Sequence, residues 1–191
     1  MPEVQNAWET LESRCRSCRR CEGLADARRN VVFGVGSVSS KILFVGEAPG
    51  EQEDARGEPF VGRAGQLLDR FLIHVGLPRE TVYIANILKC RPPSNRDPLP
   101  EEQDACMEYL WEQVRLLDPK ILVCLGRIAA KKLISEDYKI TAEHGRFTEK
   151  NGILMTAVYH PAALLRDPNK KPETLLDFVA IRAKAEELGI V

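Results

Sequence analysis

Five cysteines fall into two groups whose spacing is typical of metal binding. Cys15 and Cys18 form a Cys-x-x-Cys pair that Cys21 extends, whereas Cys90 and Cys106 come much later in the chain. Disulfides are rare in a reducing cytosol, so such a set there indicates a metal site or catalysis. Four thiolates from two distant segments can bind zinc or an iron–sulfur cluster, and spacing alone does not separate the two. Cys21 is an alternative ligand to Cys18; without a metal, the first pair is a surface pair and Cys106 a small buried hydrophobe.

Polar residues also stand where three apolar runs end. Glu47 lies within Gly46-Glu47-Ala48-Pro49-Gly50, and its carboxylate is a candidate base or charge stabiliser. Asn86 offers an NH₂ donor and an oxygen acceptor, which match O4 and N3–H of uracil and oppose the reversed groups of cytosine. A site built on such hydrogen bonds can discriminate by about 10⁴. His160-Pro161 ends another run. The structural alternatives are turns at the first two positions and a packing role for the histidine.

Strands and helices are expected to alternate along the chain. Short apolar runs predict strands at residues 41–46, 82–87, 121–125 and 153–158, with a hairpin partner for the last at 146–148. Helices are expected over residues 3–20, from about 67 to 75, from 100, from 127 and over 172–188. This order is typical of an α/β fold with a mainly parallel sheet. Ligands of such sheets bind beyond the carboxyl ends of the strands, so the loops 46–62, 86–99 and 160–171 are predicted to share a site. Cys124, inside the third run, is interpreted as core packing.

The bulk composition suits one compact domain. The chain has 191 residues, 44% of them hydrophobic, and a formal net charge of −1. No apolar run approaches the ~20 residues of a membrane span, and the N-terminus lacks the apolar segment of a signal peptide. We therefore expect a cytoplasmic, monomeric protein without a membrane partner. Because no global positive field is present, nucleic-acid binding would depend on local basic patches. The candidates are Arg14, Arg16, Arg19 and Arg20; Lys89, Arg91 and Arg96; and Arg166, Lys170 and Lys171.

Three motifs together resemble the family-4 uracil-DNA glycosylases. The first is the segment from Gly46 to Gly50 with Glu53-Asp54 and the following stretch from Gly57 to Gly65. The second is Tyr83-Ile84-Ala85-Asn86, which runs into Lys89-Cys90-Arg91-Pro92-Pro93-Ser94-Asn95-Arg96. The third is the stretch from His160 to Arg166. They occur in the expected order between about Cys15 and Arg166, and their combination is far more specific than any one of them.

The resemblance implies a fold and a role for each matching residue. The fold is a three-layer α/β/α sandwich around a central four-stranded, mainly parallel sheet, forming one glycosylase domain over residues 1–191 with an N-terminal cysteine-bearing helical segment. The family carries a [4Fe–4S] cluster, whose ligands map to Cys15, Cys18, Cys90 and Cys106. Phe60 would stack on the extruded uracil, Asn86 would read its edge and His160 would face O2. Gly46, Glu47 and Ala48 would line the pocket.

The implied activity is removal of uracil from DNA by hydrolysis of the N-glycosidic bond after the base has been flipped out. Leu164, Leu165 or Arg166 would fill the vacated stack, and the loop with Arg91 would lie beside the DNA. A related branch that captures DNA covalently has a basic insertion after the asparagine strand; here Lys89 passes directly to Cys90, so turnover is expected. The alternatives are a glycosylase for another deaminated base, such as hypoxanthine, and a non-catalytic iron–sulfur carrier or adaptor.

Overall fold

The four apolar runs form the centre of one sheet in the computed structural model, which describes residues 2–191. The strand order is β1-β3-β2-β4-β6-β5. The central strands β3, β2, β4 and β6 are all parallel, whereas the short strands β1 and β5 pair antiparallel at the two edges. The strands are β1 Val35–Gly36, β2 Ile42–Gly46, β3 Tyr83–Asn86, β4 Ile121–Leu125, β5 Thr148–Lys150 and β6 Ile153–Val158. The expected α/β fold is confirmed; β6 lies at the predicted residues, its hairpin partner β5 lies two residues later than predicted, and β1 is additional.

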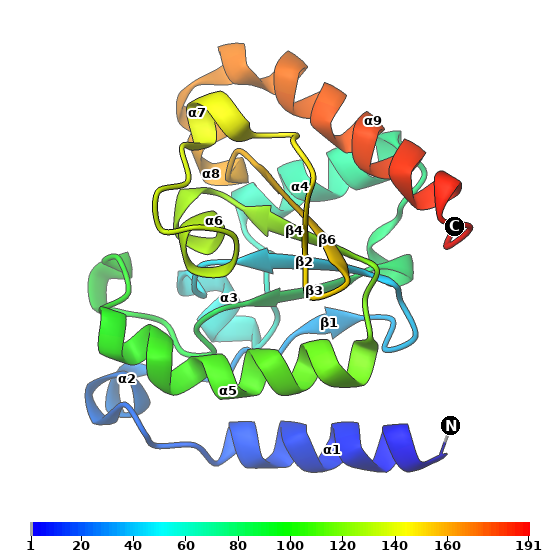
Figure 1. Ribbon diagram of the computed structural model, residues 1–191. Coiled ribbons are helices and arrows are strands. Elements are labelled where there is room, and N and C mark those ends of the chain that lie inside the picture. Colours follow the sequence, from blue (N-terminus) through cyan, green and yellow to red (C-terminus); the bar gives the residue numbers. More distant parts are fainter. Residues whose placement is uncertain (1) are drawn as a thin grey trace.

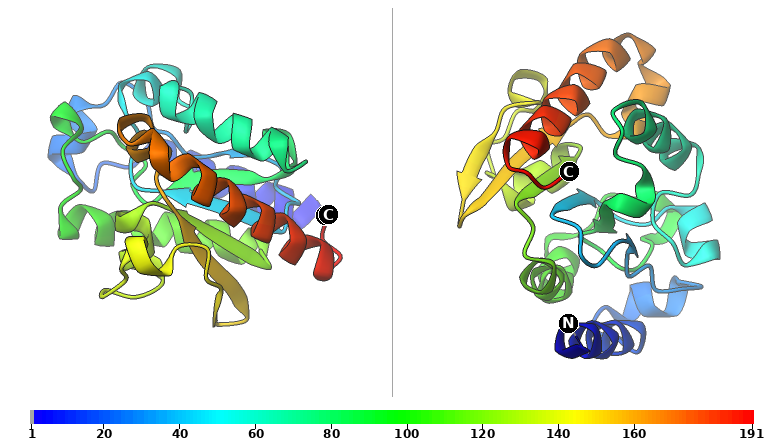
Figure 2. Two further views of the ribbon diagram at one scale, coloured as in Figure 1. Left: turned by 90° about the horizontal axis from the view of Figure 1, so that it is seen from above. Right: turned by 90° about the vertical axis from the view of Figure 1, so that its right-hand side faces the viewer.

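Helices cover both faces of this sheet (Figures 1 and 2). One core joins α1, α5 and α6 to Leu43, Val45 and Cys124, and the other joins α4, α8 and α9 to Phe44 and Val123. Alternate residues of the strands therefore serve opposite faces, as the period of two requires. The helices are α1 Pro2–Arg16, α2 Glu22–Ala27, α3 Glu51–Arg56, α4 Arg63–His74, α5 Pro100–Leu117, α6 Arg127–Leu133, α7 Ile140–Glu143, α8 Pro161–Arg166 and α9 Lys171–Glu187. Single 3-10 turns, η1 Arg79–Thr81, η2 Pro93–Asn95 and η3 Pro168–Lys170, link the larger elements.

The N-terminal helix differs from its prediction. It was expected to continue to residue 20, but α1 ends at Arg16 and a separate short helix, α2, begins at Glu22. Trp8, Leu11 and Cys15 are buried at helical spacing, so α1 is anchored by one face. Beyond Arg16 the chain turns, which leaves Cys18 and Cys21 on the connection between α1 and α2. Two predicted loops also contain short helices, α3 within 46–62 and α8 within 160–171.

The carboxyl ends of the parallel strands lie at one edge of the sheet. Gly46 at the end of β2 pairs in register with Asn86 at the end of β3, and Leu125 ends β4 beside Val158 of β6. The loops that follow all four strands therefore start within a small region. No helix within residues 2–191 combines the length and the apolarity that a membrane crossing needs.

The anchoring of α1 can be tested at Trp8. Its ring is 5% exposed and meets Phe33 and Tyr83 edge to face, with centroids 5.6 and 5.0 Å away. We expect Trp8→Ala to lower the free energy of unfolding by about 3–5 kcal/mol, because it leaves a large cavity. The matched control is Trp111→Ala on α5, whose ring is 43% exposed; its expected loss is about 0.5 kcal/mol. Guanidinium unfolding followed by circular dichroism measures both, and equal losses would contradict the proposed anchoring.

Candidate active site

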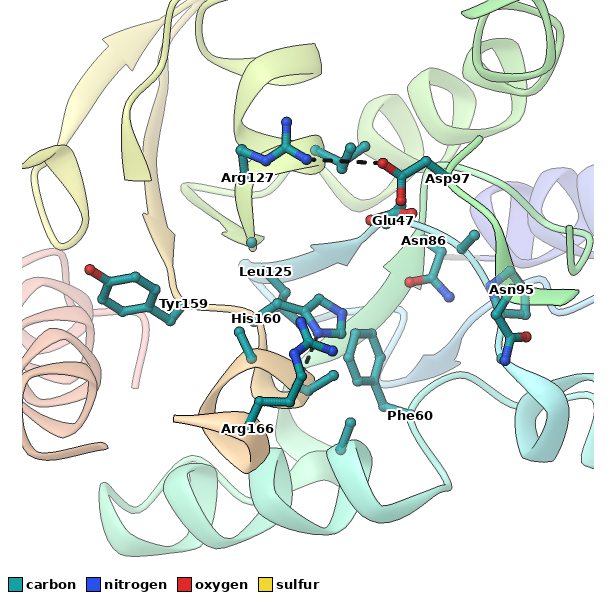
Figure 3. A pocket seen from close by; sticks show the side chains of 18 of the residues that line it. Glu47, Phe60, Asn86, Asn95, Asp97, Leu125, Arg127, Tyr159, His160 and Arg166 are labelled. Atoms are coloured by element: carbon teal, nitrogen blue, oxygen red, sulfur yellow. Dashed lines mark hydrogen bonds and ion pairs between the residues drawn. The ribbon is translucent and has the colours of Figure 1, made fainter. Parts of the chain in front are cut away.

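The loops at this edge of the sheet enclose a cavity of about 770 Å³. Phe60, Asn86 and His160 all line it, although they are far apart in sequence and follow different strands. Figure 3 shows their side chains facing one another across the same space. Glu47, Ala48 and Arg166 also line this cavity. The structure thus brings Glu47, Ala48, Phe60, Asn86 and His160 to one place, whereas Gly46, which was also predicted to line the pocket, is not among the residues that line the cavity.

Gly46 permits the close approach on which this arrangement depends. A Cβ atom at this position would lie 2.6 Å from Phe60 Cζ and would also collide with the Oδ1 atom of Asn86. Real Cβ atoms do not approach other atoms so closely, so any side chain here would displace the ring or the amide. The glycine at the end of β2 is therefore required by the neighbouring side chains, and a turn alone does not explain it.

Asn86 presents an unused acceptor to the cavity. The residue is 2% exposed, and its Oδ1 atom has no hydrogen-bond partner among residues 2–191. A buried oxygen without a partner costs free energy, and such a group commonly marks the place of a ligand or an ordered water. Its backbone is held firmly, because the ammonium of the fully buried Lys89 donates to the Asn86 carbonyl at 2.8 Å and to Gln113 Oε1 at 2.6 Å. Asn86 is thus a fixed amide with a free acceptor.

Phe60 adopts an uncommon backbone conformation beside Asn86. Its φ is +54°, in the left-handed region that non-glycine residues rarely occupy. The ring is 6% exposed and lies 5.7 Å, centroid to centroid, from the His160 ring. Glu53 holds the next two residues, since its Oε1 atom accepts from Val61 N and Gly62 N at 2.9 Å each. The ring is a flat apolar wall of the cavity.

His160 is a neutral hydrogen-bond donor in this site. Burial, with a further contribution from the positive charge of Arg166, lowers its pKa to about 4. Its Nδ1 atom accepts from Ala162 N at 3.1 Å, where His160 caps the N-terminus of α8. In the neutral ring the proton therefore resides on Nε2, which is free to donate.

The carboxyl group of Glu47 has a raised pKa. Burial, with a smaller contribution from the nearby Asp97, raises its pKa to about 7, and Arg127 opposes the shift. Arg127 and Asp97 lie 4.0 Å apart on the cavity wall (Figure 3). Neither was identified from the sequence. Arg127 could have been found, because it follows Gly126 at the carboxyl end of β4, where residues of parallel sheets meet ligands.

The residues predicted to face DNA separate into two groups. Leu164 is fully buried in the core beneath α8, which rules it out as an intercalating side chain. Leu165 is half-buried against the same core, and Arg166 is exposed. Arg91 is half-buried and donates through Nε to Asn95 Oδ1 at 2.8 Å. Arg91, Leu165 and Arg166 therefore retain accessible surface.

The candidate basic patches are also changed by the structure. Lys89 is buried and Arg96 is paired with Glu102 at 2.5 Å. All four arginines between residues 14 and 20 form ion pairs with nearby carboxylates on α1, α2 and α5. This N-terminal patch is therefore electrically neutralised, which leaves the surface around Arg91 and Arg166 as the better match for a polyanion.

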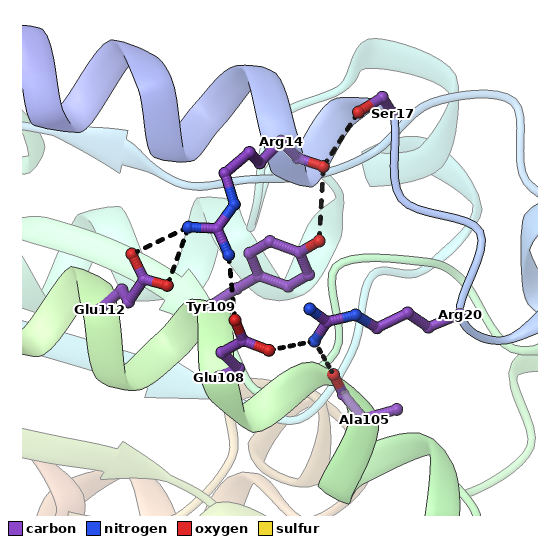
Figure 4. A network of polar contacts seen from close by, with 7 residues as sticks. All are labelled: Arg14, Ser17, Arg20, Ala105, Glu108, Tyr109 and Glu112. Carbon is purple, nitrogen blue, oxygen red and sulfur yellow. Dashed lines mark hydrogen bonds and ion pairs between the residues drawn. The ribbon is translucent and has the colours of Figure 1, made fainter.

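Two of these N-terminal arginines, Arg14 and Arg20, contact α5 through the polar network shown in Figure 4. Arg14 donates to Glu112 at 3.0 Å and to Glu108 at 2.9 Å, and Arg20 donates to Glu108 as well. Tyr109 donates from its hydroxyl to the Arg14 carbonyl at 3.4 Å. These contacts join the end of α1 to α5. They therefore bring the segment with the first cysteines beside the helix that carries Cys106.

Five cysteine thiols interact with one another in this region. All are free, and Cys15, Cys90 and Cys106 are buried. Burial, together with the negative charges of Cys106, Cys90 and Cys18, raises the pKa of Cys15 to about 12 against the opposing charge of Lys89. Cys21 is influenced in the same way by Cys90 and Cys18. Within residues 2–191 no three His, Cys, Asp or Glu side chains already stand in metal-binding geometry. The soft donor set of a thiolate metal site is nevertheless gathered here.

Two donors already face these thiols. Arg28 Nη1 donates to Cys90 Sγ at 3.0 Å, and the Lys89 amide donates to Cys106 Sγ at 3.4 Å. Such donors stabilise thiolates and are common around thiolate-bound metals. Cys124, in contrast, is buried within β4, where burial alone raises its pKa. The core interpretation of Cys124 fits this environment.

Comparison with known proteins identifies the family. A family model described as the uracil DNA glycosylase superfamily matches residues 33–182. The chain belongs to this superfamily. The type-4 uracil-DNA glycosylase of Archaeoglobus fulgidus is 46% identical over 173 residues, which cover 86% of each protein. That of Sulfurisphaera tokodaii is 43% identical over 187 residues, or 93% of this chain and 84% of the relative. That of Thermotoga maritima is 43% identical over 161 residues, or 83% of each. The resemblance to the type-4 branch of the superfamily is confirmed.

Proposed function

We propose that the protein is a uracil-DNA glycosylase that hydrolyses the N-glycosidic bond of uracil in DNA and leaves an abasic site. The observation that carries this proposal is the unpartnered Oδ1 atom of Asn86, which lies in a cavity between an aromatic wall and a neutral imidazole donor. The names of the type-4 relatives support the same activity.

Recognition of the base follows from these three side chains. Uracil has N3–H as a donor and O4 as an acceptor, so Asn86 can accept from the first and donate to the second. Cytosine reverses both groups and would leave the buried amide unpaired. The Phe60 ring provides a surface for stacking. Because the target atom is inaccessible within a duplex, the base must be extruded first, at a cost of a few kcal/mol.

Cleavage separates charge along one bond. The C1′–N1 bond breaks with its electron pair on uracil, which leaves an anion delocalised over O2 and O4 and a cationic sugar. Nε2–H of His160 can donate to O2 and stabilise the developing anion, as oxyanion-hole donors do. Water then adds to C1′ and loses a proton, which ends on the uracil anion. The Glu47 carboxylate either takes that proton or stabilises the cation electrostatically, and both roles need its ionised form.

We propose a [4Fe–4S] cluster as a resident cofactor, since the soft thiol donors near the α1–α2 connection are of the type that binds iron–sulfur clusters. We propose Cys15, Cys18, Cys90 and Cys106 as its ligands, with Cys21 as the alternative to Cys18. When bound, such a cluster supplies four metal–thiolate links that tie the α1–α2 connection to α5 and to the loop after β3. Arg28 and the Lys89 amide would then donate to ligand sulfurs. This role is structural, because none of these cysteines lines the cavity.

The remaining surface suits DNA. We propose that Arg91 and Arg166 contact the phosphate backbone and that Leu165 or Arg166 occupies the space left by the extruded base. We further propose that residues 1–191 act as one monomeric glycosylase domain in the cytoplasm.

The activity is tested with oligonucleotides that each contain a single uracil, hypoxanthine, thymine or cytosine. We expect single-turnover release of uracil and not of cytosine, which reverses the donor and the acceptor that the amide reads. Thymine and hypoxanthine offer an N–H beside a carbonyl as uracil does, so their release measures selection by groups other than Asn86. Asn86→Asp should lose uracil release by at least about 10²-fold and gain some release of cytosine, since a carboxyl group alters the donor pattern. Release of hypoxanthine instead of uracil would reassign the substrate, and no release of any base would favour the adaptor alternative.

The pH dependence reports on Glu47. Because the carboxylate is the active form and its pKa is about 7, the rate should fall as the pH drops from about 8 to about 6. Glu47→Gln should lower the rate by about 10²–10⁴-fold and abolish the fall in rate between about pH 8 and about pH 6 (the acid limb of the profile). The neutral state of His160 persists down to its pKa of about 4, so the variant should show a flat profile above pH 5. An unchanged acid limb in Glu47→Gln would exclude Glu47 as its source.

The cofactor is tested by iron and sulfide analysis and visible absorbance of anaerobically purified protein. We expect a brown protein whose iron is lost in Cys90→Ser and Cys106→Ser. Cys124→Ser is the matched control, because this thiol is buried in β4 away from the others and iron should be retained. Cys21→Ser should retain iron and Cys18→Ser should lose it; the reverse result would exchange these two ligands. A colourless, zinc-containing protein would contradict the iron assignment.

A further inference from the structure

The backbone at Phe60 needs an external constraint. Its left-handed conformation is one that a phenylalanine seldom adopts, so the surrounding structure must impose it. The Phe60 carbonyl also presses against the first turn of α4. A Cβ atom at Gly65 would collide with the carbonyl oxygen of Phe60, and only glycine leaves room for it. The position of the ring is thus set by where this carbonyl is held.

Arg79 holds that carbonyl. It lies in η1, directly before β3, and donates through Nη1 to the Phe60 oxygen at 2.8 Å and through Nη2 to the Pro59 oxygen. Nη1 also donates to Asp69 Oδ1 on α4 at 2.9 Å. The planar guanidinium can bridge two successive carbonyls while the carboxylate fixes its orientation, and a lysine ammonium cannot reproduce this fork.

The loop from Pro59 to Gly62 is held by two side chains of opposite charge. Glu53 accepts from the amides of Val61 and Gly62, whereas Arg79 donates to the carbonyls of Pro59 and Phe60. Arg79 is not among the residues that line the cavity. Its side chain is 21% exposed and that of Asp69 is 36% exposed. Arg79 therefore contacts the backbone of the aromatic wall without reaching the space that a base would occupy.

We propose that Arg79 is a positioning residue that fixes the Phe60 ring as a preformed stacking surface for the extruded base. This inference rests on the proposed uracil-DNA glycosylase function and assigns Arg79 a role in it through Phe60 alone. A stacking surface that is in place before the base arrives avoids the cost of ordering it during binding. Loss of Arg79 should therefore weaken base binding more than it slows the bond cleavage itself.

The test compares Arg79→Met, Arg79→Lys and Asp69→Asn with the wild type and with a matched control, Arg182→Met. Arg182 Nη1 donates to the Gly76 carbonyl at 3.0 Å beyond the other end of α4, so it makes the same kind of contact away from the cavity. The measurements are single-turnover uracil release over a range of enzyme concentrations, inhibition by free uracil, and thermal unfolding. Rates are taken at a temperature where every variant is folded.

We expect Arg79→Met to raise the enzyme concentration that half-saturates uracil release by about 10- to 100-fold, the scale for a misplaced group in a site. The concentration of free uracil needed for inhibition should rise by a similar factor. Arg79→Lys should recover only part of this loss, Asp69→Asn should show a smaller loss of the same kind, and Arg182→Met should match the wild type. In a Phe60→Ala background, Arg79→Met should cause no further loss, because its effect passes through the ring.

Two results would overturn the inference. One is wild-type uracil release together with wild-type inhibition by uracil in a folded Arg79→Met protein. If Arg79→Met does not fold, the same result in both Arg79→Lys and Asp69→Asn would overturn the inference. The other is an equal loss in the wild-type and Phe60→Ala backgrounds, which would mean that Arg79 acts independently of the ring. If the wild type itself releases no uracil, the proposed function fails and this inference fails with it.

Discussion

At the end of β2, the space that a side chain would fill at Gly46 is occupied instead by the Phe60 ring and the amide oxygen of Asn86. The parallel register places Gly46 directly beside Asn86, and the loop after β2 returns Phe60 over both. With a larger residue the aromatic wall and the amide could not approach each other, and the cavity would not form around a planar ring. The later features of the site, including the His160 donor and the Glu47 carboxyl, are arranged around this contact.

Burial shifts the pKa values of two cavity residues in opposite directions. Burial favours the uncharged form of every group, so it lowers the pKa of His160 and raises that of Glu47. A neutral imidazole can donate to a developing anion without first losing a charge, and a carboxyl near neutrality can change its protonation at physiological pH. A pair of groups whose pKa values have moved apart in this way is typical of sites that divide acid and base roles.

The loop after β3 links the cavity to the cysteines. Asn86 and Cys90 are four residues apart, and between them Lys89 is buried with its ammonium on the Asn86 carbonyl and on Gln113 of α5. Gln113 in turn donates to the Phe33 carbonyl at 3.0 Å. A cofactor held by Cys90 and Cys106 would therefore reinforce the backbone that presents the amide, although it would not touch the base. This connection gives a structural cofactor a physical reason to influence recognition at a distance.

The sequence by itself determined the four central strands and their alternation with helices, because short apolar runs bounded by glycine and proline have few alternatives to buried parallel strands. It also indicated which loops meet, because the carboxyl ends of such strands share one edge. Only the tertiary structure decided how side chains are used. Leu164 follows a motif histidine and still packs into the core, and Lys89 belongs to a basic motif yet is fully buried. The arginines before residue 21 are neutralised by carboxylates on α5, on α2 and within α1. Burial, ion pairing and the left-handed turn at Phe60 depend on contacts between residues distant in the chain, and no local pattern records those contacts.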